Sequence, residues 1–170
     1  MNTIFNQFAF MTEKSILKRS KHTMKIYLFL IFLSLNSCNR SLEFRVNEFL
    51  NLTDDNFELN TPYVIIPNAG CPGCLSSAED LVLKFKGSSC VKFVFIEVTS
   101  LKELKIKLGH DILTYPNILL DNNGFASELD LHTFYPLIFY PKINLLHEIS
   151  PKNPESISNF IESISVEGCK

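Results

Sequence analysis

The sequence predicts an α/β domain built on a central mixed sheet with flanking helices. Apolar segments typical of strands alternate with amphipathic segments typical of helices after residue 60, and two short apolar segments lie close together in the last third. Alternating strands and helices favour a parallel sheet, whereas two strands joined by three residues favour an antiparallel hairpin. The chain has 170 residues, of which 46% are hydrophobic, so one domain of ordinary size is expected.

The first expected elements are a helix, a strand and a second helix. A short amphipathic helix is predicted between Asn39 and Asn60, because apolar residues recur there at spacings of three and four. The apolar run over 63–66 predicts a strand, which a Pro-Asn-Ala-Gly turn ends. The segment after Cys71 then places apolar residues on one helical face. These residues are Leu75, Ala78, Leu81, Val82 and Phe85.

The remaining elements complete the sheet. Segment 91–98 is β-branched and aromatic on both faces, which indicates a central parallel strand covered by helices. A helix over 101–108 ends at Gly109. We then expect a strand over 117–120, a short helix or irregular connection over 125–131, and a hairpin over 136–140 and 144–148. Asn153 as N-cap and Pro154 in the first turn predict a closing helix.

The N-terminal segment has the layout of an export signal. From Met24, a lysine is followed by ten residues, 26–35, that are apolar except for Ser34. About 20 apolar residues are needed to span a membrane, so this segment fits a secretory signal peptide over 24–37, with an uncleaved membrane helix as the alternative. Residues 1–23 form an upstream extension with no structural role assigned.

The residues Leu35-Asn36-Ser37-Cys38 resemble the lipobox of bacterial lipoproteins, although Asn36 departs from its usual small residue. The resemblance implies cleavage before Cys38 and lipid attachment to its thiol, which would anchor the protein to a membrane. Residues 38–60 would then be a lipid-anchored linker, and 61–170 the folded domain. The implied location is the bacterial cell envelope, facing the periplasm.

The charge distribution excludes nucleic acid as a partner. Residues 1–37 hold five basic side chains and one acidic side chain, so the remaining 11 basic and 17 acidic groups leave a net charge of −6. A protein that binds phosphate backbones needs a basic surface.

The motif that points to chemistry is Cys71-Pro72-Gly73-Cys74, at a junction between a strand and a helix. The partial positive charge of a helix N-terminus favours a thiolate and lowers the pKa of the first cysteine. Cys71 would therefore act as the nucleophile, and the more sheltered Cys74 would resolve a mixed disulfide. The sequence thus predicts a redox-active pair, with Cys71 and Cys74 as catalytic residues.

Two other interpretations of the cysteine pair stay open. A zinc site needs two further ligands at suitable spacing, which Cys90, Cys169 and the scattered histidines do not supply, so no metal is expected. A purely structural disulfide is the second alternative. Cys90 and Cys169 are either separate thiols or a second disulfide. No phosphate-binding glycine loop or hydrolase grouping is found, and no cofactor is expected.

The segment from about Thr61 to Ser165 resembles the thioredoxin-like fold, and within it the TlpA/ResA-type thiol–disulfide oxidoreductases of bacterial envelopes. The resemblance rests on YVIIP, CPGC at a helix start, FVFIEV, ILLDNNGFASELDL, FYPLIFY, INLLHEI and a final helix. It implies exchange or reduction of disulfides in exported proteins. It also implies that Pro136 follows a cis bond opposite the dithiol, with Tyr135 and Pro136 contacting substrate. Pro116 is the rival candidate for this proline, but a hairpin and a final helix directly follow Pro136.

The chain departs from the family at three places, one of which is the order Pro-Gly between the cysteines, where thioredoxin has Gly-Pro. Gly70 and Ala69 stand where the family usually has Trp, and Ile65 stands where thioredoxins have a buried Asp. The alternative function is therefore a non-catalytic thioredoxin-fold lipoprotein that binds a partner and keeps CPGC as a structural disulfide.

Overall fold

The computed structural model describes residues 40–166, so the predicted signal segment, Cys38 and Cys169 lie outside the described residues. The described chain forms one mixed five-stranded sheet in the order β3-β2-β1-β4-β5. The strands are β1 (Tyr63–Pro67), β2 (Lys92–Ile96), β3 (Ile118–Leu120), β4 (Leu137–Tyr140) and β5 (Leu145–Glu148). β1, β2 and β3 are parallel, and β4 and β5 pair antiparallel. The predicted α/β class with a mixed sheet is confirmed.

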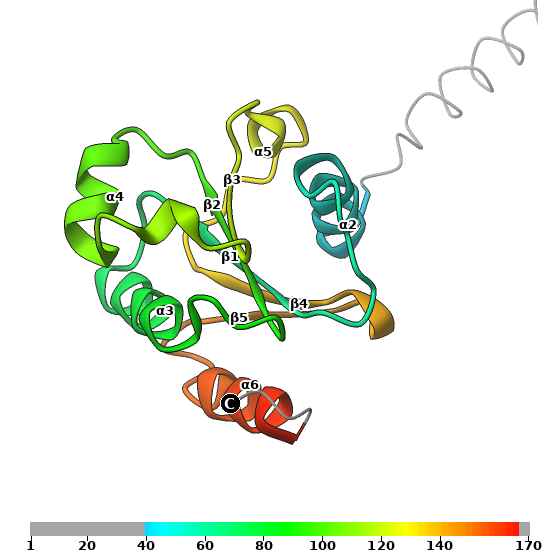
Figure 1. The fold of residues 1–170 in the computed structure, drawn as a ribbon. Coiled ribbons are helices and arrows are strands. Elements are labelled where there is room, and N and C mark those ends of the chain that lie inside the picture. The colour runs from blue at the N-terminus through cyan, green and yellow to red at the C-terminus, as the bar shows by residue number, and fades with distance from the viewer. Residues whose placement is uncertain (1–39, 167–170) are drawn as a thin grey trace, which may run out of the picture. The chain divides into compact units, whose positions relative to one another are not determined.

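Helices cover both faces of this sheet (Figure 1). α3 (Pro72–Phe85), α4 (Leu101–Leu108) and α6 (Ser156–Val166) pack on one face, while α2 (Leu42–Thr53) and α5 (Phe125–Glu128) pack on the other. Two short 3₁₀ turns, η1 (Ile112–Thr114) and η2 (Pro141–Ile143), complete the chain. The result is a three-layer arrangement with two hydrophobic cores.

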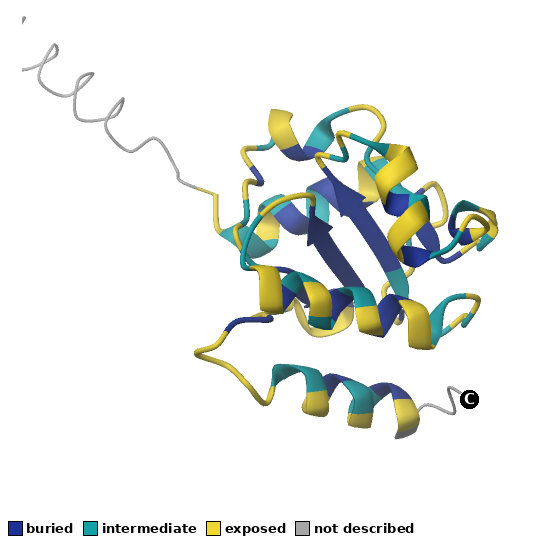
Figure 2. Ribbon diagram, turned by 90° about the vertical axis from the view of Figure 1, so that its left-hand side faces the viewer, coloured by how far each residue is buried: buried dark blue, intermediate teal, exposed yellow. Residues whose placement is uncertain are grey.

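The strand residues alternate between these two cores. On β1, Tyr63 and Ile65 face α2, whereas Val64 and Ile66 face α3. Side chains on a strand point to opposite faces in turn, so a central strand with helices on both sides must be apolar throughout. Figure 2 shows central strands that are buried along almost their whole length.

The predicted linker, in which a short helix is expected, contains that helix as α2, and α2 packs against the sheet. Ser41 caps its N-terminus by accepting a hydrogen bond from the Phe44 N–H. Val46, Phe49 and Leu50 are fully buried against the sheet. The hydrophobic packing of the domain therefore begins before residue 61.

A buried ionic network fixes the end of α2 to the sheet. Asp54 is 5% exposed and accepts hydrogen bonds from the Tyr63 hydroxyl at 2.8 Å and from Lys92 Nζ at 2.6 Å. Burial alone would raise the pKa of Asp54, but these hydrogen bonds outweigh it and lower the pKa below 3.8. Burial, together with the bond to Asp54, raises the pKa of Tyr63, so its hydroxyl stays protonated.

Three connecting segments meet at one end of the strands. Ile65 of β1 pairs with Leu137 of β4, and Leu137 pairs with Glu148 of β5. The chain therefore leaves β1, enters β4 and leaves β5 at the same edge. Topology brings the CPGC segment, the residues before β4 and the residues after β5 together there.

The closing helix differs from its predicted start. The sequence predicts Asn153 as its N-cap, but α6 begins at Ser156, and the Ser156 N–H donates to the Asn153 carbonyl at 3.1 Å in a preceding turn. Asn153 thus belongs to the turn that follows β5.

Candidate functional site

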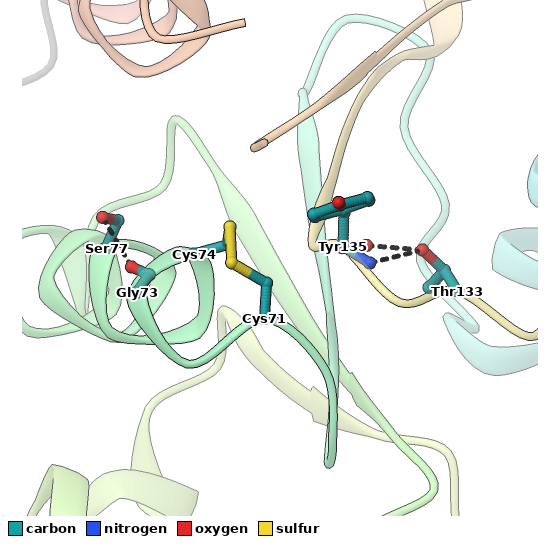
Figure 3. The surroundings of a disulfide bond; sticks show 6 residues. All are labelled: Cys71, Gly73, Cys74, Ser77, Thr133 and Tyr135. Carbon is teal, nitrogen blue, oxygen red and sulfur yellow. Dashed lines mark hydrogen bonds between the residues drawn. A yellow bond between two sulfur atoms is a disulfide. The ribbon is translucent and has the colours of Figure 1, made fainter. Parts of the chain in front are cut away.

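Cys71 and Cys74 form a disulfide at the start of α3, with Cα atoms 5.2 Å apart (Figure 3). Cys71 is the N-cap residue and Pro72 opens the helix, as the sequence predicts. Pro suits this position because the first amides of a helix have no partner within the helix. The disulfide therefore lies at the N-terminus of α3, which is the positive end of the helix dipole.

The two sulfur-bearing residues differ in accessibility. Cys71 is partly exposed, whereas Cys74 is 6% exposed and contributes to the core beneath α3. Although Cys71 is the N-cap residue, its side chain makes no capping hydrogen bond to the first amides of α3. An exposed first cysteine and a sheltered second one suit attack and resolution respectively.

The segment before β4 lies directly against Cys71. The Cys71 N–H donates to the Phe134 carbonyl at 3.2 Å. Phe134 itself is 61% exposed, and its ring meets the Tyr135 ring edge-to-face at 5.1 Å between centroids. An aromatic surface thus adjoins the disulfide.

Tyr135 and Pro136 directly follow Phe134 at the entry to β4, but their peptide bond does not have the expected geometry. Every peptide bond in residues 40–166 is trans, so the predicted cis bond before Pro136 is wrong. The trans form is the default for X–Pro bonds. The Thr133 hydroxyl accepts from the Tyr135 N–H and donates to the Tyr135 carbonyl (Figure 3), which satisfies this backbone locally.

Pro136 is buried and Tyr135 is half-buried. The Pro136 carbonyl accepts a hydrogen bond from the Ile149 N–H at 2.8 Å, which joins the entry to β4 with the exit from β5. Of the pair, Tyr135 is therefore the residue with side-chain surface next to the cysteines.

Polar contacts also fix the connecting segments at this end of the sheet. The Asn68 side chain donates to the Thr99 hydroxyl at 3.1 Å. His132 Nδ1 lies 2.8 Å from Glu97 Oε1, and Arg45 donates to the Asp130 backbone carbonyl. Glu97 and Asp130 both adopt positive φ, at 56° and 53°. Non-glycine residues with this conformation are held by their surroundings.

A pocket of about 240 Å³ opens beside the disulfide. Its wall comes from the start of α3 and from the segment after β5, including Cys71, Cys74, Ser150 and Ser156. A larger pocket of about 560 Å³ lies between β5 and the start of α6 and contains neither cysteine. Of these two pockets, the smaller one is lined by both cysteines.

The loop contacts and Ser150 were not predicted as site features. The Ser150-Pro151 dipeptide after a predicted strand was a turn signal, but its place beside CPGC follows only from the strand order. Cys90 is disulfide-bonded, whereas Cys169 lies outside the described residues. Within residues 40–166, no group of three His, Cys, Asp or Glu side chains is arranged to hold a metal ion.

No helix in the described part of the chain is both long and apolar enough to cross a membrane. No protein family model, curated protein or solved structure matches this chain significantly.

Proposed function

We propose that this protein is a thiol–disulfide oxidoreductase with a thioredoxin-like fold, which exchanges or reduces disulfides of exported proteins. The observation that carries the proposal is the Cys71–Cys74 disulfide at the N-terminus of α3, with Cys71 partly exposed and Cys74 buried. The mixed sheet, with its two final antiparallel strands and closing helix, supports the fold assignment.

The reaction proceeds through a mixed disulfide. In the reduced protein, the Cys71 thiolate attacks one sulfur of a partner disulfide, and the other partner sulfur leaves as a thiolate. The Cys74 thiolate then attacks Cys71 Sγ, which forms the Cys71–Cys74 disulfide and releases the second partner thiolate. The partner gains two electrons and the protein loses two. An external dithiol returns these electrons by the reverse sequence.

The helix N-terminus favours the first step. Its partial positive charge stabilises the Cys71 thiolate before attack and again when Cys71 is the leaving group. Tyr135 forms the neighbouring surface for the partner polypeptide, and the buried Pro136 holds it in place at the entry to β4.

The protein is anchored to a bacterial membrane through lipid on Cys38 in this proposal, and it faces the periplasm. The support is the lipobox-like sequence before Cys38, and α2 begins at Leu42, a few residues later. The catalytic domain would therefore lie close to the membrane surface. Labelling with radioactive palmitate, with Cys38→Ser as the control, tests the anchor.

A trapping experiment tests the catalytic roles. Cys74→Ser is expected to accumulate a mixed disulfide through Cys71, because no resolving thiol remains, whereas Cys71→Ser traps none. Non-reducing electrophoresis of the full chain after acid quenching measures both variants. Equal trapping by the two variants contradicts the assigned roles.

A redox titration distinguishes this function from a structural disulfide in a partner-binding module. Structural disulfides in exported proteins have reduction potentials below roughly −300 mV, whereas working dithiols lie above this value. We expect the Cys71–Cys74 pair to equilibrate with dithiol buffers above that limit. A potential below it favours the partner-binding module.

A further inference from the structure

The pocket beside the disulfide contains an unusual polar group. Ser150 is 6% exposed and lines the pocket, and its hydroxyl has no hydrogen-bond partner among the described residues. The Ser156 hydroxyl, in the same wall, is also buried without a partner. Buried hydroxyl groups are normally paired, so an unpaired one calls for an explanation, such as a ligand that completes it.

Two helices begin at this pocket. Gly73 and Cys74 belong to the first turn of α3, and Ser156 is the first residue of α6. Both helices are longer than eight residues, at 14 and 11 residues. Each helix N-terminus carries partial positive charge and amides without intrahelical partners. Their shared pocket is therefore favourable for an anion.

No charged side chain lines the pocket to oppose this effect. The nearest charged residues in the sequence after β5, Lys152 and Glu155, line the adjacent larger pocket and carry opposite charges. The electrostatic preference thus comes from the helix termini and the hydroxyl groups alone.

We propose that this pocket binds a carboxylate carried by the disulfide partner, close to the sulfur that Cys71 attacks. The inference rests on the proposed oxidoreductase function and specifies its substrate class. Ser150 donates its hydroxyl hydrogen to the carboxylate, and the helix termini favour the negative charge. A partner with an ammonium group at the same position is disfavoured by the same field.

The chemistry is the exchange described above, applied to a disulfide RS–SR′ in which R carries the carboxylate. Cys71 thiolate bonds to the sulfur of R and releases R′S⁻, and Cys74 thiolate then releases RS⁻. The disulfide is the oxidant, the dithiol protein is the reductant, and two electrons pass to the two leaving thiolates. A carboxylate in the pocket holds R next to Cys71 during both steps.

A series of small disulfides with different charges tests the preference. The dithiothreitol-reduced full chain, freed of excess reductant, is mixed with 3,3′-dithiodipropionate, 2-hydroxyethyl disulfide or cystamine, and the rate of each reaction is divided by the rate with dithiothreitol alone. This division removes the intrinsic reactivity of each disulfide. We expect the normalised rate for the dicarboxylate to exceed that for cystamine about tenfold, as two helix termini and a charged hydrogen bond together allow.

Ser150→Ala is expected to reduce this preference to about threefold, because the helix termini remain. Ser158→Ala is the matched control: its exposed hydroxyl lies on α6, bonds to the Glu155 carbonyl at 2.9 Å and does not line the pocket. A wild-type protein without preference, or a full preference in Ser150→Ala, overturns the proposal.

A binding measurement without redox chemistry separates this proposal from the proposed function. Propionate titrated into ¹⁵N-labelled oxidised full chain should shift the amide signals of Gly73, Cys74 and Ser156, whereas propionamide should not. Ser150→Ala should weaken the propionate shifts severalfold. No response to propionate overturns the carboxylate site, while failure of the neutral disulfide to react contradicts only the oxidoreductase function.

Discussion

Gly70 packs directly against the backbone of Phe134. A Cβ atom built on Gly70 would overlap the Phe134 carbonyl oxygen and lie 3.0 Å from the carbonyl carbon. The next residue, Cys71, donates its N–H to that same oxygen at 3.2 Å. Glycine is therefore required here by a close backbone approach, which also explains why no large side chain precedes the first cysteine.

Substituting Gly70 by alanine should separate the two segments. The added methyl group cannot be accommodated without moving the backbone before β4, so we expect the free energy of unfolding to fall by about 1–3 kcal/mol. Urea unfolding of the full chain measures this loss. Faster hydrogen exchange at the Cys71 amide should accompany it, because the bond to Phe134 is broken.

Gly73→Ala is the matched control, since a Cβ on Gly73 meets no heavy atom within 4 Å. Gly73 lies within α3, where alanine is favoured over glycine by roughly 0.5–1 kcal/mol. The two substitutions should therefore change stability in opposite directions. A comparable loss in both variants would show that the close approach to Phe134 is not the cause.

The elements that the sequence predicts well are those with local signals. The helix over 101–108 has Ser100 as N-cap and Gly109 at its end, with φ 109°, and its observed bounds match the prediction. The position of CPGC at a helix start is also predicted from local sequence, because proline in the first turn and the apolar face of α3 fix where that helix begins.

The features that the sequence does not predict depend on long-range packing. Two of these features are the approach of Phe134 to Gly70 and the burial of Ser150 beside the disulfide. Both arise because β4 pairs antiparallel with β1 and β5, so that the start of β4 and the end of β5 lie next to the end of β1. No residue near Gly70 in the sequence indicates either contact. The Tyr135–Pro136 bond has the ordinary trans form, which the comparison of motifs does not predict.

Asn117 should be a strong determinant of stability. It is 3% exposed, and its amide group donates to the Phe85 and Val91 carbonyls at 3.0 and 3.1 Å and accepts from the Gly87 N–H at 2.9 Å. Asn117→Ala removes all three hydrogen bonds, each of which contributes about 1 kcal/mol net, and only the Phe85 carbonyl keeps another partner in the described chain, the Ser88 N–H. We expect a total loss of about 3 kcal/mol in urea unfolding.

Asn123→Ala provides the comparison for Asn117, because Asn123 is exposed in the turn after β3. Exposed substitutions usually change stability by less than about 0.5 kcal/mol. If Asn117→Ala falls in that same range, the three hydrogen bonds do not stabilise the connection between α3 and β2.

The ion pair between Asp54 and Lys92 should also stabilise the fold at neutral pH. Asp54→Asn keeps an acceptor for Tyr63 but leaves Lys92, whose side chain is 13% exposed, without its carboxylate. Removing one member of a buried pair leaves an uncompensated charge, so we expect a loss of about 2–3 kcal/mol. The exposed neighbour Asp55, changed to Asn, should have little effect in the same urea titration.

The contribution of Asp54 should depend on pH with a defined sign. Because hydrogen bonds from Lys92 and Tyr63 lower the pKa of Asp54 below 3.8, the folded protein binds a proton there less readily than the unfolded chain. The stabilisation is therefore complete above the unfolded pKa and is lost as pH falls through the lowered folded value. The difference in unfolding free energy between wild type and Asp54→Asn should be constant above about pH 5 and shrink below about pH 4. Lys92→Met removes the main hydrogen-bond donor, so in that background the same difference should vary less with pH, and an unchanged pH profile there would contradict the role of Lys92.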